Sequence, residues 1–101
     1  MQVIVKVKKI VGTREFNDKS GEPRKVTTVV AEELTNDAYK DSYVIEFWDK
    51  NSDAFLDNRK EGDSIKVSIA FRAQARSYKD KEGKEQFLWE QKVSGFNTSE
   101  L

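Results

Sequence analysis

Two segments of the sequence place an arginine and an aromatic residue at the same spacing ahead of a polar turn. Residues 14–21 (REFNDKSG) and residues 76–83 (RSYKDKEG) share the pattern R-x-[FY]-x-D-K-x-G. An arginine can contact phosphates and an aromatic ring can stack on bases, so the repeated pair indicates a surface that binds such groups. The alternative is purely structural, because Asp and Gly favour tight turns in any hairpin.

The second segment lies inside a longer alternating stretch. Residues 71–78 (FRAQARSY) and 85–93 (EQFLWEQKV) flank a polar, glycine-containing loop, KDKEGK. This pattern predicts a β-hairpin, and the incoming strand, which begins near Ile65, has one apolar face. The opposite face of that strand carries Lys66, Arg72, Gln74, Arg76 and Tyr78.

The candidate binding residues are the cations and aromatics of the two hairpins. Stacking contributes about 1–3 kcal/mol per base, so one exposed tyrosine with two arginines would suffice for a minimal binding site. On the second hairpin the candidates are Arg72, Gln74, Arg76 and Tyr78, with Lys79, Lys81 and Lys84 at its tip. On the first strand and its hairpin they are Lys6, Lys8, Arg14 and Phe16.

The two tryptophans and their neighbours are assigned from strand parity. Trp48 shares its parity with Glu46, and a glutamate is rarely buried without a partner. The pattern therefore points Trp48 outward and Phe47 inward. Trp89 has both apolar and polar neighbours at its own parity, and for this residue a core position is favoured over a stacking one.

The composition narrows the classes of function. The chain has 101 residues, which suffice for one domain with a single core. It contains no cysteine and no histidine, which removes disulfides, thiolate metal sites and the commonest general base. Eighteen carboxylates show no catalytic spacing, so neither an enzyme, such as a carboxylate-metal nuclease, nor a cofactor or metal is expected. The opening MQVIVKVKK does not fit a signal peptide or a membrane span, so we expect a cytoplasmic protein without a membrane partner.

The net charge is zero, but the charges are unevenly distributed. Residues 1–31 contain seven Lys/Arg and three Asp/Glu, residues 32–63 contain four and ten, and residues 64–101 contain seven and five. The two hairpins are therefore basic and the middle segment is acidic, and folding could separate a basic face from an acidic one. An ordinary solvated surface would explain the acidic segment equally well.

The expected elements are three strands, a short helix and two further strands. Alternating and β-branched residues predict strands over residues 2–11, 24–34 and 43–48, a helix over residues 51–62, and then the hairpin described above. In the helix, Ser52 is the expected N-cap, Phe55 and Leu56 are expected to face inward, and Gly62 is the expected stop.

A glycine in the first strand pattern determines the expected architecture. Gly12 predicts a bend, after which the alternation resumes to Phe16, and a bent first strand can pair on both sides and close a barrel. The order β-β-β-α-β-β is that of the all-β, five-stranded OB-fold barrel, which binds oligonucleotides or oligosaccharides on one face and two hairpin loops. We expect one such domain over residues 1–96 and a short C-terminal tail over residues 97–101.

Several short motifs in the second half of the chain resemble one protein family. The segments VIEFWDK (44–50), KEGDSIKV (60–67) and ARSYKDKEGKEQF (75–87) are similar to the second half of bacterial single-stranded DNA-binding proteins. The resemblance covers residues 43–90, about half of the chain. It implies that Tyr78 stacks on bases, that Arg76 contacts the nucleic-acid backbone, and that Phe47 is an aromatic residue of the binding surface.

The same resemblance bears on partners. Proteins of this family commonly form dimers or tetramers, so it implies a homo-oligomer, with a role in DNA replication, repair or recombination. The first half of this chain lacks the family's usual opening motif. The chain ends in NTSEL, without the linker and acidic, Phe-terminated tail that recruit partners, so tail-mediated recruitment is not expected.

Two functions remain open from the sequence. The first is sequence-tolerant binding of single-stranded nucleic acid, with DNA as the expected ligand and RNA as the alternative, through a basic, aromatic-bearing barrel face and two hairpin loops. The second is an OB-fold protein-interaction module that does not bind nucleic acid, with its exposed aromatics as hot spots. The repeated Arg and aromatic pairs favour the first, whereas the zero net charge fits the second better.

Overall fold

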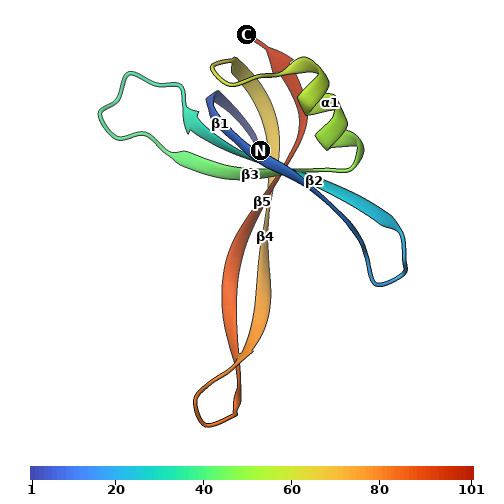
Figure 1. The fold of residues 1–101 in the computed structure, drawn as a ribbon. Helices are drawn as coiled ribbons and strands as arrows, with labels where there is room; N and C mark the ends of the chain where they lie inside the picture. The colour runs from blue at the N-terminus through green and yellow to red at the C-terminus, as the bar shows by residue number, and fades with distance from the viewer.

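The computed structural model describes residues 1–101, whose strands close into a barrel (Figure 1). The elements are β1 (Gln2–Asn17), β2 (Pro23–Glu33), β3 (Ser42–Trp48), α1 (Lys50–Asn58), β4 (Ser64–Lys79) and β5 (Glu85–Glu100). Around the barrel the strands follow the order β1-β2-β3-β5-β4, and every pairing is antiparallel except that of β3 with β5. This confirms the predicted OB-fold barrel with one helix between β3 and β4.

β1 bends so that it belongs to both sides of the barrel. Residues Gln2–Lys6 pair with β4, and the strand from Val5 onward pairs with β2. The register with β2 shifts twice, once beside Lys8 and once beside Gly12. Such bulges bend a strand and increase its twist. The predicted bend at Gly12 is therefore present, and the structure adds an earlier one.

The barrel interior is filled by ten buried apolar side chains, Val5, Val7, Val29, Ala31, Ile45, Phe47, Phe55, Ile65, Val67 and Ile69. The rings of Phe47 and Phe55 are stacked, with their centroids 4.4 Å apart. At this level β5 contributes Gly95, where an added Cβ would lie 2.5 Å from Cε1 of Phe47 and 2.7 Å from Cγ2 of Ile45. The Phe47 ring therefore packs directly against the backbone of β5, and only glycine leaves room for it.

The orientations predicted for two neighbouring pairs are largely confirmed. Phe47 is 1% exposed, whereas Trp48 is half-buried on the outer surface. Phe47 is thus a core residue, and its assignment to the binding surface is wrong because its ring cannot reach a ligand. In α1, Phe55 faces the core as predicted, but Leu56 is exposed instead of facing inward.

α1 is shorter than predicted and is anchored in a different way. It ends at Asn58, and the expected stop, Gly62, lies in the turn that leads to β4. Ser52 is not its N-cap, because the helix already begins at Lys50. Ser52 is buried instead, and its hydroxyl shares a 2.6 Å hydrogen bond with that of Thr27 on β2. No helix of the structure has the length and apolar character needed to cross a membrane.

Two hairpins extend beyond the barrel, one formed by β1 and β2 and the other by β4 and β5 (Figure 1). The β4–β5 hairpin, which we call the arm, leaves the barrel after Ile69, and every residue of β4 from Ala70 onward is exposed. At its other end β5 continues to Glu100, which pairs with Ile65. Residues 97–100 are therefore part of a strand, and the prediction of a tail from residue 97 is wrong.

Candidate nucleic-acid interface

Two aromatic rings and two guanidinium groups gather on the outer surface of β1, β2 and β3. Phe16 and Trp48 meet edge to face, with ring centroids 6.0 Å apart and planes at 81°. The guanidinium carbon of Arg14 lies 5.3 Å from the centre of the Phe16 ring, and that of Arg24 lies 5.0 Å from the Trp48 ring. Both distances fall within the range of about 6 Å over which a ring face attracts a cation. We call these four residues the aromatic–arginine cluster.

The strand register explains why the cluster forms. Val26 of β2 pairs with Arg14 on one side and with Trp48 on the other, and Arg24 pairs with Phe16. Residues paired in this way present their side chains on the same face of a sheet. Val26 is buried although it lies outside the core cluster, so the side chains beside it on the outer surface must cover it.

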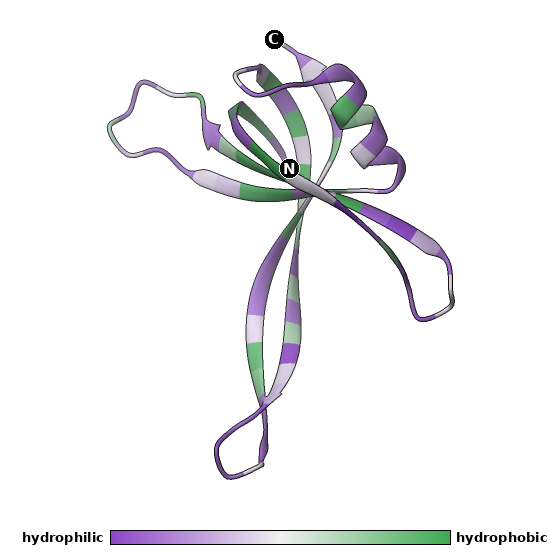
Figure 2. Ribbon diagram, viewed as in Figure 1, coloured by the Kyte–Doolittle hydropathy of each residue, from purple (hydrophilic) through white to green (hydrophobic).

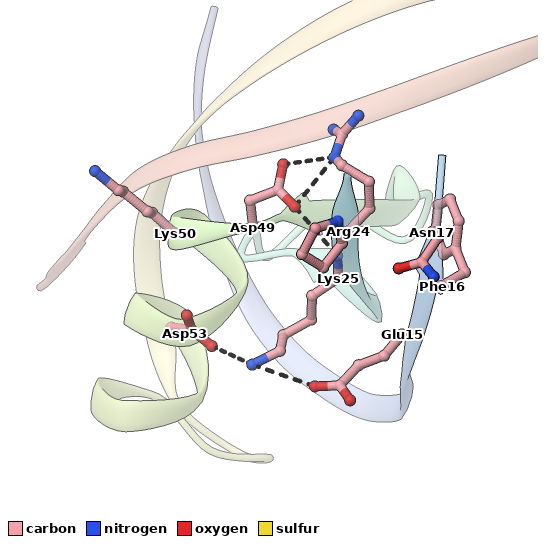
Figure 3. Close-up of a pocket in the computed structure, with 9 residues that line it drawn as sticks. Glu15, Phe16, Asn17, Arg24, Lys25, Asp49, Lys50 and Asp53 are labelled. Atoms are coloured by element: carbon pink, nitrogen blue, oxygen red, sulfur yellow. Dashed lines mark hydrogen bonds and ion pairs between the residues drawn. The ribbon is translucent and has the colours of Figure 1, made fainter. Parts of the chain in front are cut away.

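A pocket of about 590 Å³ beside the cluster contains the groups that hold Arg24 in place (Figure 3). Nε of Arg24 donates hydrogen bonds to both carboxylate oxygens of Asp49, at 2.9 and 3.2 Å. Lys25 lies 2.7 Å from Asp53 and 3.6 Å from Glu15, and the hydrogen bond to Asp53, followed by its charge, raises the pKa of the lysine. Carboxylates thus engage both cations, and Asp49 holds Arg24 over the Trp48 ring.

The arm carries the predicted polar face. Across it, Arg72 pairs with Lys92, Gln74 with Glu90, Arg76 with Leu88, and Tyr78 with Gln86. All four predicted side chains of β4 are exposed and share this face. Glu90 forms ion pairs with Arg76 at 3.2 Å and Lys92 at 3.6 Å. With Arg72, this face therefore carries three cations and one carboxylate. The face keeps an excess of positive charge.

A shallow groove joins the cluster to the polar face of the arm. Two hollows of about 360 and 270 Å³ share Thr28, Glu46 and Lys92 in their linings, and the first also reaches Arg14. Thr28 pairs with Glu46 between β2 and β3, and Glu46 pairs with Ser94 on β5. The cluster, this groove and the polar face of the arm therefore form one outer surface, which we call the binding face.

Both hairpin tips are closed by an aspartate, which confirms the turn predicted from the Asp and Gly of the repeated motif. Asp18 accepts three hydrogen bonds from residues 20–22, and Asp80 accepts three from residues 82–86. These bonds lower the pKa of both carboxyl groups, chiefly through the Ser20 hydroxyl for Asp18 and through a backbone N–H for Asp80. The glycine that follows in each tip has a positive φ.

The predicted lysines fall into two groups. Lys79, Lys81 and Lys84 are exposed at the tip of the arm, next to its polar face. Lys6 lies where β1 runs between β2 and β4, paired with Glu32 and Ser64, and Lys8 lies at the first bulge of β1. The structure does not bring Lys6 and Lys8 to the binding face, because the bend in β1 separates them from the cluster.

The opposite face of the arm carries exposed apolar side chains. Figure 2 shows hydrophobic segments along both strands of the arm. Across this opposite face, Phe71 pairs with Val93, Ala73 with Gln91, Ala75 with Trp89, and Ser77 with Phe87. Trp89 is 70% exposed, Phe87 62% and Phe71 49%. The predicted core position of Trp89 is wrong, since the arm has left the barrel at this point and no second layer covers it. We call these eight residues, none of them charged, the apolar arm face.

The sequence analysis missed three residues of the binding face, Arg24, Glu46 and Lys92. The positions of the two turns could have predicted where Arg24 and Lys92 lie. If each tip closes symmetrically about the five residues that begin with its aspartate, 18–22 and 80–84, counting back along the strands places Arg24 opposite Phe16 and Lys92 opposite Arg72, as the structure shows. Glu46 was used only to orient its neighbour, and its position in the groove depends on the pairing of β3 with β5.

Comparison with protein-family models and with curated proteins finds no match to this chain. No three carboxylates of the structure are grouped so that they could hold a metal ion. The binding face offers cations, aromatic rings and carboxylates, which bind a ligand by charge, stacking and hydrogen bonding.

Proposed function

We propose that this protein binds single-stranded nucleic acid along the binding face, with DNA as the first ligand to test. The observation that carries the proposal is the aromatic–arginine cluster, because Phe16 and Trp48 are held on the outside of the barrel with a guanidinium over each ring. Outward-facing rings beside fixed cations suit unpaired bases joined by phosphates. The groove and the arm extend the same chemistry over a longer path.

The proposed path runs from the cluster, across the groove, to the polar face of the arm. Bases stack on Trp48 and on Tyr78, which is 52% exposed near the arm tip. Phosphates lie over Arg14, Arg72 and the cations at the tip. Stacking needs no sequence readout, so binding along most of this path tolerates any sequence.

The first expected result concerns salt. Titration with an oligo-dT of about 15 nucleotides should quench tryptophan fluorescence, and the logarithm of the affinity should fall linearly with the logarithm of salt concentration, with a slope that reports about two to five neutralised phosphates. Arg72→Ala should reduce the magnitude of that slope by about 0.7. Lys6→Ala is the matched control and should leave the slope unchanged, because Lys6 lies outside the binding face. A flat titration at low salt would contradict the proposal.

A second candidate function is protein interaction, and the apolar arm face favours it. Phe71, Phe87 and Trp89 form an exposed apolar surface without a charged residue among the paired positions around them. Exposed apolar patches of this kind mark interaction sites. We propose a second copy of the chain as the partner, because two identical uncharged faces can cover each other about a two-fold axis. The two candidate functions use opposite faces of the arm and are compatible.

Trp89→Glu tests this second proposal. We expect the unsubstituted protein to be a dimer or larger at micromolar concentration, and the variant to be a monomer, since a buried unpaired carboxylate is costly. Light scattering after size-exclusion chromatography gives both masses directly. Tyr39→Glu, a substitution of an exposed aromatic in the loop between β2 and β3, should keep the original mass. A monomeric unsubstituted protein at high concentration would contradict this proposal and would not affect the proposal of nucleic-acid binding.

A further inference from the structure

Glu46 has an unusual position in the middle of the binding face. It lies on the outward side of β3, between Thr28 on β2 and Ser94 on β5, and it lines both hollows of the groove. Its Oε1 atom is buried and has no hydrogen-bond partner. Lys92, a cation that lines both hollows, pairs with Glu90 at 3.6 Å instead. An acceptor is therefore left unsatisfied where the ligand is proposed to pass.

A buried acceptor without a partner costs free energy, so this carboxylate favours any ligand that brings a donor to it. A phosphate cannot do so, because it carries the same charge. Apart from Lys92, which lines the groove, the cations of the binding face lie toward its two ends, in the cluster and on the arm. A nucleic-acid strand that crosses the groove therefore binds most favourably with its phosphates over the cations and a base edge turned toward Glu46.

The chemistry of a carboxylate selects among the bases. An ionised carboxylate only accepts hydrogen bonds, and it has two oxygens to offer. Guanine alone presents two adjacent donors on its Watson–Crick edge, the N1–H and the 2-amino group, whereas thymine presents one N–H flanked by two carbonyl oxygens that repel the carboxylate. Unpaired bases expose this edge to proteins. The terminal torsion of glutamate is broad, so the half-buried side chain can turn to meet both donors.

We propose that Glu46 makes the groove a guanine-preferring subsite within an otherwise sequence-tolerant binding face. This inference rests on the proposed function and adds to it a specificity-determining residue. In the free protein, Oε1 of Glu46 has no hydrogen-bond partner and Lys92 pairs with Glu90, so a guanine edge supplies two directed hydrogen bonds to the carboxylate.

The test compares three labelled oligonucleotides that differ at one central position, a run of thymidines, the same run with one guanine, and the same run with one hypoxanthine. Hypoxanthine lacks the 2-amino group, so its comparison with guanine requires no change in the protein. We expect the guanine oligonucleotide to bind about fivefold or more tightly than the thymidine run, with hypoxanthine between them.

Glu46→Gln should abolish this preference and leave the affinity for the thymidine run unchanged or higher, because the variant loses one acceptor and a negative charge. Glu32→Gln is the matched control, since that carboxylate pairs with Lys40 outside the binding face, and it should keep the preference. Equal affinities for all three oligonucleotides, or a preference that survives Glu46→Gln, would overturn this inference while nucleic-acid binding stands. Absence of binding to all three would overturn the proposed function and this inference with it.

Discussion

Replacing Phe47 with alanine is expected to lower the free energy of unfolding by about 3–5 kcal/mol. The ring is 1% exposed, stacks on Phe55 with centroids 4.4 Å apart, and lies against Gly95 of β5. Its removal leaves a cavity at the point where the helix closes the barrel. Because a domain of this size has only about 5–15 kcal/mol of stability in total, the loss should be visible as a large shift of the urea midpoint followed by circular dichroism.

The control for this experiment is Leu56→Ala on the same helix. Leu56 is exposed, so its truncation should cost about 1 kcal/mol or less. Phe47→Ala with a midpoint close to that of the unsubstituted protein would contradict the assignment of Phe47 to the core. It would also reopen the role in ligand binding that the family resemblance implies.

Replacing Trp48 with alanine is expected to weaken binding of an oligo-dT by about tenfold to a hundredfold. The substitution removes the stacking surface, the edge contact with Phe16 and the ring over which Arg24 is held. Because the variant loses a tryptophan, its affinity is best measured by fluorescence anisotropy of a labelled oligonucleotide.

The matched control is Tyr39→Ala, which removes an exposed aromatic side chain from the loop between β2 and β3, outside the binding face. Its affinity should equal that of the unsubstituted protein. A thermal melt of each variant separates loss of binding from loss of folding. Native melting together with unchanged affinity in Trp48→Ala would remove the cluster from the proposed site.

The element order and the barrel were predictable from the sequence because they depend on local signals. Alternation with a period of two specifies strands, and the Asp-x-x-Gly segments specify two tips whose geometry needs only neighbouring residues. The outward orientation of Trp48 also followed from a local rule, its shared parity with Glu46, which lies on the outer surface although its Oε1 atom is buried. Here the strand pattern was correct, whereas the family resemblance had pointed to Phe47.

The errors concern properties that depend on the surroundings of a strand. The strand pattern around Trp89 would place this residue in the core if the strand were inside the barrel. At Trp89 the arm has already left the barrel, and the side chain is exposed. Alternation alone does not show where a strand stops being covered by other elements. The predictions that Leu56 faces inward and that Gly62 ends the helix were wrong for a related reason. A helix of nine residues at the mouth of a barrel buries a narrow stripe, which is occupied by Ser52 and Phe55.

The groove was not predictable from local signals either. It is lined from β1, β2, β3 and β5, and it exists only because β3 pairs with β5 in parallel across the closure of the barrel. No turn or period in the sequence specifies that pairing. The charge distribution did indicate that the arm is basic, but the pairing of Glu90 with Arg76 and Lys92 depends on the register of β4 with β5 and was not predicted.

The hairpin tips have a consequence for how such an arm can change in length. All side-chain hydrogen bonds of Asp80 stay within residues 80–86, so the tip closes without help from the barrel. Residue pairs could be inserted below it, or removed, without disturbing the turn. Two residues per strand would preserve which side chains face each way, whereas one per strand would exchange the two faces beyond the insertion. The arm can therefore become longer or shorter in steps of two residues per strand while its two faces keep their orientation.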